Sequence, residues 1–271
     1  MAFHDTLRDV QRSQKSLLCI GLDTDPARLP SPLARTPEAV LEFNRHIVEA
    51  THELVCAYKI NLAFYEVLGE HFWHSVHETL ALIPRGIVTI GDGKRGDIGN
   101  TSSYYARTLR EVYRFTASTV NPYMGTDAVA PFLEDPDHGV FILALTSNPG
   151  ARDFQHLRLR KSPLYEAVVR KARRWDTRRN CGLVVGATRP RQLQRIRQLA
   201  PSMPLLVPGI GAQGGDLRLA VRYGCDRHGE MALFTASRSV LYASSGPDYA
   251  SAAHRAARAL RDEINSLRTR R

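Results

Sequence analysis

Short apolar runs recur along the whole chain at intervals that leave room for one helix between neighbours. Eight of them have the length and the apolar, often β-branched, composition of buried strands; they cover residues 17–22, 54–60, 87–90, 117–120, 140–145, 182–185, 205–207 and 231–235. Helical patterns alternate with them, at residues 37–52, 62–82, 101–113, 163–175, 189–199, 217–223 and about 247–267. This alternation predicts a parallel sheet.

The chain length selects the form of that sheet. At 271 residues, eight strand–helix units fit a closed (β/α)8 TIM barrel, so we expect one α/β domain over residues 1–271. The alternative is an open doubly wound sheet, but no GxGxxG motif follows the first apolar run.

The formal net charge of +10 favours anionic ligands. The basic runs at residues 170–174 and 255–271 contain no aromatic side chains, which favours solvated helix faces over a nucleic-acid surface. No apolar run reaches the ~18 residues of a membrane helix and no signal-peptide pattern is present, which predicts no membrane contact. The four cysteines lack a CxxC pattern, as expected of reduced thiols in a cytoplasmic protein, and Cys19 and Cys181 are predicted to be small core residues.

Polar residues gather where the predicted strands end. They are Asp23, Lys59, Asp92, Lys94, Asn121, Thr146, Ser147 and Arg238, and Gly209 follows the seventh run. Because the catalytic residues of (β/α)8 barrels lie at the carboxyl ends of the strands, this end of the barrel is the predicted active site.

Lysine is rare in this chain, occurring at only five positions among the 37 Lys and Arg residues, and one of them is Lys94 between Asp92 and Asp97. This placement indicates a need for a compact ammonium, although an ordinary surface ion pair is the alternative. The neighbouring carboxylates favour the charged form, whereas a Schiff-base lysine must be neutral to attack. We therefore expect Lys94 to act as an acid and a fixed positive charge, in a reaction that develops negative charge on carbon.

A glycine-rich turn, P-G-I-G-A-Q-G-G-D at residues 208–216, follows the seventh apolar run, and Arg238 follows the eighth. Such a turn exposes backbone N–H groups to an anion, and a guanidinium adds bidentate contact. The loops after strands seven and eight form the usual phosphate site of this barrel, so the sequence predicts a phosphate monoester on the substrate.

Two further features favour structural explanations. His71, His74 and His77 spread over about a third of a helix circumference, too widely for a compact ligand set, so no metal site is predicted. Residues 148–163 form a long basic loop that could cover the barrel mouth or lie on the surface.

The stretch D-G-K-R-G-D-I-G-N-T at residues 92–101 resembles the D-x-K-x-x-D-I signature of the orotidine 5'-monophosphate decarboxylase family in its longer prokaryotic form. The resemblance covers most of the chain and includes, in order, residues 21–23, 59–66, 121–125, 146–150, 185–188, 208–216 and 237–238. Two positions depart from the pattern: Ile60 stands where proline is expected, and Gly93 where alanine is usual. Neither removes a functional side chain, so they bear only on local backbone shape.

The resemblance implies that a network of alternating charge carries the chemistry. Its members would be Lys59, Asp92, Lys94 and Asp97. In that family the carboxylate at Asp97 comes from the partner subunit of a homodimer, so the active site would be shared across the interface. Ile98 and Thr101 would cross the same interface, Thr101 toward the ribose. Asp23 would bind the ribose hydroxyls.

The remaining implied contacts concern the base and the phosphate. Ser147 would read the amide edge of the pyrimidine, Gln213 would link base and phosphate, and Pro208 would pack beside the base. Arg238 would hold the phosphate together with the glycine-rich turn. The glycines of that turn assigned to substrate binding are Gly209, Gly211, Gly214 and Gly215.

The implied activity is decarboxylation of orotidine 5'-monophosphate (OMP) to uridine 5'-monophosphate (UMP) and CO2, the last step of UMP biosynthesis, with no cofactor and no metal. The expected partners are OMP, UMP and a second copy of the chain, without nucleic acid or membrane. One alternative is a Mg²⁺-dependent sugar-phosphate decarboxylase or aldolase related to 3-keto-gulonate 6-phosphate decarboxylase, which shares D-x-K-x-x-D. The other is a non-catalytic barrel that binds nucleic acid through its basic surface.

Overall fold

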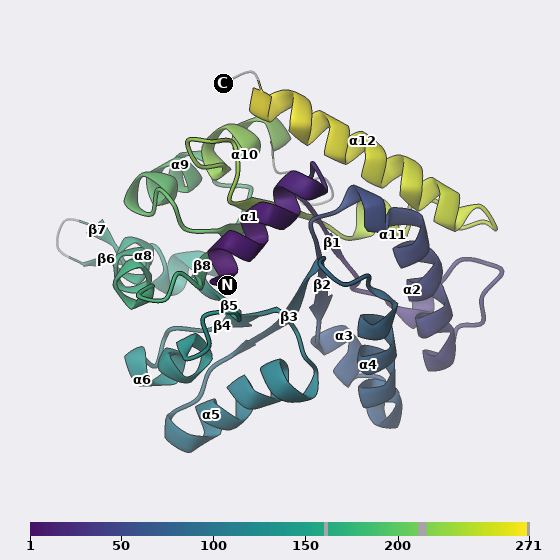
Figure 1. The fold of residues 1–271 in the computed structure, drawn as a ribbon, viewed down its shortest axis with the longest axis horizontal. Helices are drawn as coiled ribbons and strands as arrows, with labels where there is room; N and C mark the ends of the chain where they lie inside the picture. Colours follow the sequence, from purple (N-terminus) through teal and green to yellow (C-terminus); the bar gives the residue numbers. More distant parts are fainter. Residues whose placement is uncertain (160–161, 211–215, 270–271) are drawn as a thin grey trace.

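The computed structural model describes residues 1–159, 162–210 and 216–269, and at its centre is a closed barrel of eight strands (Figure 1). The barrel strands are β1 (Leu18–Gly21), β2 (Ala57–Asn61), β3 (Val88–Arg95), β4 (Ala117–Val120), β5 (Gly139–Leu145), β8 (Cys181–Val185), β9 (Leu205–Pro208) and β10 (Ala232–Ala236). They are hydrogen-bonded in the order β1-β10-β9-β8-β5-β4-β3-β2, and all pairs are parallel. The predicted (β/α)8 barrel is confirmed, and the open-sheet alternative is wrong.

Helices surround the barrel in Figure 1. The α-helices are α1 (Phe3–Ser13), α2 (Pro37–Thr51), α3 (Ala63–Glu66), α4 (Phe72–Leu82), α5 (Gly99–Arg107), α6 (Thr126–Val129), α7 (Ala151–Phe154), α8 (Leu164–Trp175), α9 (Pro190–Leu199), α10 (Leu217–Gly224), α11 (Arg238–Leu241) and α12 (Tyr249–Thr269). Short helical turns are η1 (Pro26–Arg28), η2 (His52–Leu54), η3 (Gly69–His71), the π-helical η4 (Thr108–Val112) and η5 (Ala130–Leu133).

Two predicted segments differ in the structure. The helix predicted over residues 62–82 is wrong in its middle, because Gly69 takes the left-handed conformation (φ +61°) between α3 and α4. The segment predicted as a loop, residues 148–163, contains α7 and the antiparallel pair β6 (Arg158–Leu159) and β7 (Ser162–Pro163).

Side chains alternate between the two faces of each barrel strand, which produces two separate apolar clusters. On β1, Leu18 and Ile20 pack outward against the helices, while Cys19 belongs to the cluster inside the barrel. The other strand residues of the inner cluster include Ala57, Val88, Ile90, Ala117, Phe141, Val184, Leu206 and Leu233. Cys19 and Cys181 are buried, as predicted, and burial raises the pKa of the Cys19 thiol to about 12.

Helix α1, which the sequence analysis missed, lies across the amino-terminal end of the barrel (Figure 1). Its apolar residues Phe3, Leu7 and Val10 recur at helical spacing and join the inner cluster. The Phe3 ring meets Phe141 edge to face, with the ring centroids 5.9 Å apart. The helix therefore closes this end of the barrel and leaves the opposite end as its entrance.

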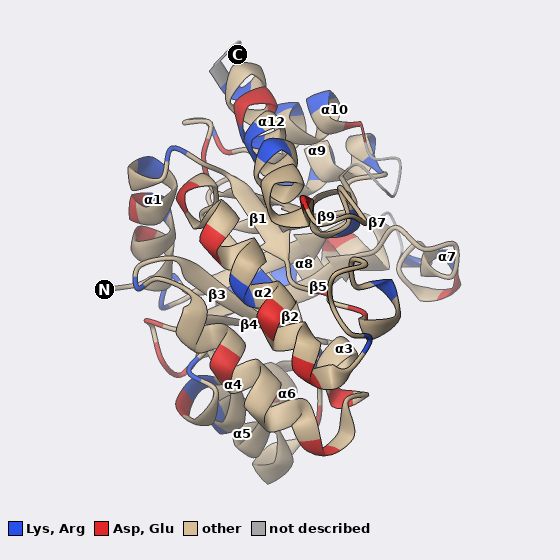
Figure 2. Cartoon of the chain, turned by 90° about the vertical axis from the view of Figure 1, so that its right-hand side faces the viewer, with Lys and Arg blue, Asp and Glu red and all other residues tan. Residues whose placement is uncertain are grey.

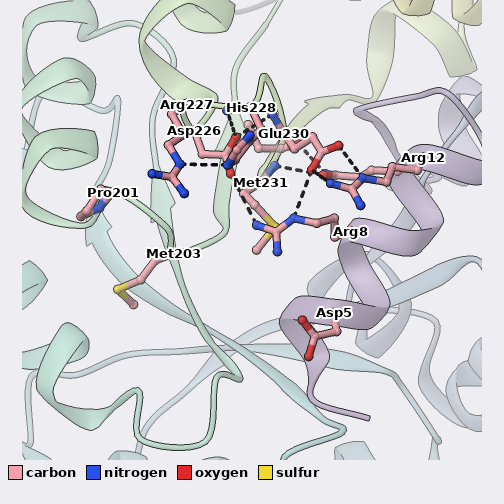
Figure 3. A network of polar contacts seen from close by, with 12 residues as sticks. Asp5, Arg8, Arg12, Pro201, Met203, Asp226, Arg227, His228, Glu230 and Met231 are labelled. Atoms are coloured by element: carbon pink, nitrogen blue, oxygen red, sulfur yellow. Dashed lines mark hydrogen bonds and ion pairs between the residues drawn. The ribbon is translucent and has the colours of Figure 1, made fainter.

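Polar contacts hold α1 in place on the loop before β10, as Figure 3 shows. Arg8 Nε and Arg12 Nε donate to the Glu230 carboxylate at 3.1 and 2.7 Å. The buried Gln11 amide donates to the Ala232 carbonyl at 2.8 Å and accepts from the Met231 N–H at 3.0 Å. These side chains therefore satisfy polar groups of one another and buried backbone groups at the start of β10.

Basic and acidic residues are interspersed over several helices in Figure 2, including α12, in keeping with the predicted solvated faces. Within the described ranges, no helix is both long and apolar enough to cross a membrane.

The closure of the barrel by α1 generates a stability prediction. Phe3→Ala should lower the free energy of unfolding by about 3–5 kcal/mol, because a fully buried ring leaves a cavity against Phe141. Urea unfolding at fixed protein concentration measures this change. The control Phe154→Ala removes an exposed ring and should cost less than about 1 kcal/mol. Equal effects of the two substitutions would show that α1 is not an integral part of the core.

Candidate active site

The carboxyl ends of the barrel strands surround a cavity of about 510 Å³, a volume typical of small-molecule sites. Seven residues predicted from the sequence line it: Asp23, Lys59, Asp92, Lys94, Pro208, Gly209 and Arg238. Further lining residues, which the sequence analysis did not select, include Asp25, Arg28, Asn61, Phe64, Ser237 and Tyr242.

The alternation of side chains along the strands explains why charged groups sit inside the barrel mouth. Lys59 is two residues beyond Ala57 on β2, and Asp92 is two beyond Ile90 on β3, so both point inward above the apolar layer. Both are almost fully buried, with 4% and 6% of their surface exposed. A buried charge is tolerated only with compensating partners, which these residues give each other.

Four side chains form a continuous charge network in the order Asp23, Lys59, Asp92 and Lys94. Lys59 Nζ lies 2.9 Å from Asp23 Oδ1 and 3.2 Å from Asp92 Oδ2. Lys94 Nζ lies 2.7 Å from Asp92 Oδ1, and its side chain is 40% exposed at the open end of the network. Lys94 thus presents an ammonium to the cavity while a buried carboxylate fixes it from behind.

The network determines the charge state of its buried members. Burial alone would favour neutral Asp92, but Lys59 and Lys94, with hydrogen bonds from Lys94 and Thr119, lower the pKa of Asp92 to about 2. Burial likewise opposes the ammonium of Lys59, yet Asp23 and Asp92 raise the pKa of Lys59 above its ordinary value. Both groups are therefore ionised across the physiological pH range.

Asp97, predicted to flank Lys94, is not part of the network in this chain. Its carboxylate accepts a hydrogen bond from the Ile98 N–H at 2.8 Å, just before α5 begins. In the part of the chain that the structure describes, it makes no ion pair with Lys94. Ile98 and Thr101 are also exposed and outside the cavity lining. The prediction that these residues serve a partner's site stays a prediction.

The opposite wall of the cavity carries the residues predicted to bind an anion. Pro208 ends β9, and Gly209 follows with φ +99°, a conformation that glycine adopts without strain. Arg238 begins α11, directly after β10, and is exposed to the cavity. The predicted residues Gly211, Gln213, Gly214 and Gly215 lie outside the described residues.

Ser147 follows β5 at the same end of the barrel but is not part of the cavity lining.

The surroundings of position 93 explain why it is a glycine. An added Cβ would lie 3.0 Å from Leu62 Cδ1 and 3.1 Å from Arg95 Nε. The alanine expected there from the family pattern would require these side chains to shift. Ile60 packs in the outer apolar cluster.

Several residues that the sequence analysis did not select contact Asp23 or line the cavity beside it. Ser237 Oγ donates to Asp23 Oδ2 at 2.7 Å, so Asp23 is held from two sides. The Tyr242 hydroxyl accepts from the Asp25 N–H at 2.9 Å, and the Arg28 guanidinium lies 4.1 Å from the Tyr242 ring centroid. Only Ser237 had a sequence signal, because it directly precedes Arg238 at a predicted strand end.

Within the described ranges, His71 and His77 face different carboxylates: His71 faces Glu38 and Glu70, while His77 faces Glu78. Among the described residues, no group of three or more potential ligands is placed to hold a metal ion.

The closed barrel and its charged mouth define the class: a (β/α)8-barrel enzyme with a site for a small anionic ligand. The family model "Orotidine 5'-phosphate decarboxylase / HUMPS family" matches residues 16–254. The chain belongs to this family.

Individual relatives are similar to this chain over nearly its full length. A curated orotidine 5'-phosphate decarboxylase of Dehalococcoides mccartyi is 48% identical over 274 residues, covering 100% of both chains. One of Thermomicrobium roseum is 48% identical over 271 residues, covering 99% of this chain and 96% of the relative. Among solved structures, the OMP decarboxylase of Leishmania donovani has a TM-score of 0.87 at 39% identity, covering 99% of this chain and 100% of that one.

The low pKa of Asp92 generates a prediction for stability against pH. A carboxyl group whose folded-state pKa lies near 2, below its ordinary 3.8, stabilises the fold above that ordinary value and loses this contribution as the pH falls through the folded-state pKa. The difference in urea midpoint between wild type and Asp92→Asn should therefore be largest near about pH 7 and shrink between about pH 4 and pH 2.5.

The control for this measurement is Asp262→Asn, which removes a mostly exposed carboxylate on α12 and should track wild type at every pH. A wild-type advantage over Asp92→Asn that stays constant down to about pH 2.5 would contradict the assigned charge state of the network.

Proposed function

We propose that this protein is an orotidine 5'-phosphate decarboxylase, which converts OMP into UMP and CO2 in the last step of UMP biosynthesis. The observation that carries the proposal is the charge network, which ends in an exposed ammonium at the mouth of the barrel. The full-length relatives that bear this name support it.

In this proposal the substrate spans the cavity. Its phosphate lies at the wall that carries Arg238 and the turn after β9, with Gln213 and the glycines of that turn as further contacts. Its ribose meets Asp23, and its base lies beside Pro208 and Ser147. Phosphate binding far from the reacting carbon stabilises the bound state in which the ring is correctly placed, and so contributes to the rate.

The chemistry follows from the charge at the other wall. The C6–carboxylate bond of the orotate ring breaks, CO2 leaves, and the electron pair remains on C6 as a carbanion with no adjacent electron sink. The fixed ammonium of Lys94 stabilises this developing charge, and because Asp92 already holds it, little reorganisation is needed. Lys94 then donates a proton to C6, which gives UMP, and solvent returns a proton to the amine.

Asp92 has a second effect in this mechanism. Its carboxylate remains ionised and lies next to the position of the substrate carboxylate, so repulsion between the two raises the energy of the bound substrate. Departure of CO2 relieves that repulsion. Lys59 lowers the energetic cost of keeping Asp92 charged, because it forms an ion pair with the other carboxylate oxygen of Asp92.

The alternatives lack a supporting observation. The curated relatives and the Leishmania donovani structure are named for OMP decarboxylation and not for a sugar-phosphate reaction. In the view of Figure 2, basic residues lie interspersed with acidic ones on several helices, an arrangement that does not favour nucleic-acid binding.

The proposal includes a homodimer with a shared site. Asp97 and Ile98 stand outside the cavity of their own chain, and Ile98 is 58% exposed. Other large apolar side chains on the neighbouring helices α4 and α5 and on η4 are also exposed: Trp73, Tyr104 and Val112. A second copy of the chain that covers this surface would bring its own Asp97 to the open side of Lys94 in the first copy.

A cytoplasmic location is also part of the proposal. All four cysteines are free and buried, as suits a reducing compartment.

Replacement of the central lysine tests the proposed function. Lys94→Ala should lower kcat for OMP by about 10³-fold or more, because it removes both the stabilising charge and the proton donor. The dissociation constant of UMP should rise by less than about tenfold, since the phosphate and base contacts lie elsewhere. The loss of OMP absorbance and calorimetric titration with UMP give the two quantities.

The matched control is Lys171→Ala, which removes an exposed lysine from α8 and should leave both quantities unchanged. Turnover of Lys94→Ala close to that of this control would refute the mechanism.

Subunit mixing tests the shared site. Lys94→Ala and Asp97→Ala homodimers should each be nearly inactive, and their mixture should recover up to about a quarter of wild-type activity, because a random hybrid contains one intact site. Mass spectrometry of differently tagged subunits verifies the exchange. An inactive mixture that contains verified hybrid dimers would exclude a site built from two chains.

A further inference from the structure

The pairing of strand β3 with β4 becomes irregular at the segment that contains Asp92 and Lys94. Gly91 pairs with Ser118 and Arg95 pairs with Val120. Three residues of β3, Asp92 to Lys94, therefore face the single residue Thr119 of β4. This is a β-bulge, a feature that redirects side chains and is often found beside active sites.

The side chain of Thr119 supplies the acceptor for a backbone N–H in this irregular segment and also bonds a network carboxylate. Its hydroxyl donates to Asp92 Oδ1 at 2.8 Å and accepts from the Lys94 N–H at 2.9 Å. Thr119 is fully buried, two residues beyond Ala117 on the inward face of β4. One oxygen atom thus contacts both a carboxylate of the network and the backbone of the lysine.

The backbone of Lys94 needs such support. Lys94 has φ +44°, in the left-handed region that residues with a side chain rarely adopt. This conformation turns the lysine back, so that its Nζ reaches Asp92 Oδ1, the same oxygen that Thr119 contacts. Conformations of this kind persist only where the surroundings enforce them.

We propose that Thr119 is a positioning residue for decarboxylation: its hydroxyl holds the bulge so that Asp92 and the ammonium of Lys94 keep their reacting geometry. The inference rests on the proposed function. Thr119 does not line the cavity, so it acts through Asp92 and Lys94. The methyl group of threonine restricts rotation of its side chain, which keeps the hydroxyl aimed at the bulge.

The test compares Thr119→Val, which keeps the shape but removes the hydroxyl, with Thr119→Ser, which keeps the hydroxyl. Loss of the hydroxyl leaves the Lys94 N–H without its buried acceptor and removes one hydrogen bond to Asp92 Oδ1. Thr119→Val should lower kcat for OMP by about 10- to 100-fold, whereas the dissociation constant of UMP changes less than about threefold. Thr119→Ser should stay within about fivefold of wild-type kcat.

Ser118→Ala is the matched control. Ser118 is the neighbouring residue on β4, equally buried, and its hydroxyl bonds His138 Nε2 at 3.0 Å on the opposite face of the strand. Its loss should lower the thermal midpoint but leave kcat unchanged, which separates a loss of positioning from a general loss of stability. If Thr119→Val does not fold, Thr119→Ala, which cannot overpack the site, is measured in the same way.

The possible outcomes distinguish this inference from the proposed function. If wild type and Ser118→Ala do not decarboxylate OMP, the proposed function fails. If they do, wild-type kcat in Thr119→Val or Thr119→Ala overturns the inference, and so does a Thr119→Ser variant as slow as Thr119→Val. A kcat loss matched by an equal loss of UMP affinity also overturns it, because the hydroxyl would then support binding in general.

Discussion

Lys59 keeps its ammonium almost completely out of water, between the carboxylates of Asp23 and Asp92. Burial of a single charge costs several kcal/mol, so none of these groups is stable there without the others. Their attraction fixes Asp92 from one side, and the ionised Asp92 in turn fixes Lys94 at the cavity. The ammonium of Lys94 is thus held in place by charges of the protein before any substrate binds.

The barrel provides the place for this network through the same alternation that builds its core. On β2, β3 and β4 the inward residues Ala57, Ile90 and Ala117 are apolar, and the next inward positions carry Lys59, Asp92 and Thr119. Helix α1 closes the apolar end with Phe3, so the polar layer opens in one direction only. Fold and site are therefore consequences of one pattern.

The sequence predicted the eight strands and most strand-end residues because both follow from short periodic patterns. It missed α1, although the spacing of Phe3, Leu7 and Val10 carried the signal, because the segment is polar on average. It could not predict the role of Thr119, since a buried strand threonine looks the same whether or not its hydroxyl faces a bulge. Asp97 shows a different limit: proximity in sequence to Lys94 did not bring the two side chains together within one chain.

The central claim is that this network promotes loss of CO2 from an orotate ring by charge alone. The most direct measurement is the absorbance of OMP on incubation with the wild-type protein in buffer that contains a metal chelator, with UMP and CO2 quantified in parallel. The account predicts complete conversion of OMP into equal amounts of UMP and CO2, at a rate that the chelator does not change. Persistent OMP, or conversion only after Mg²⁺ is restored, would contradict it.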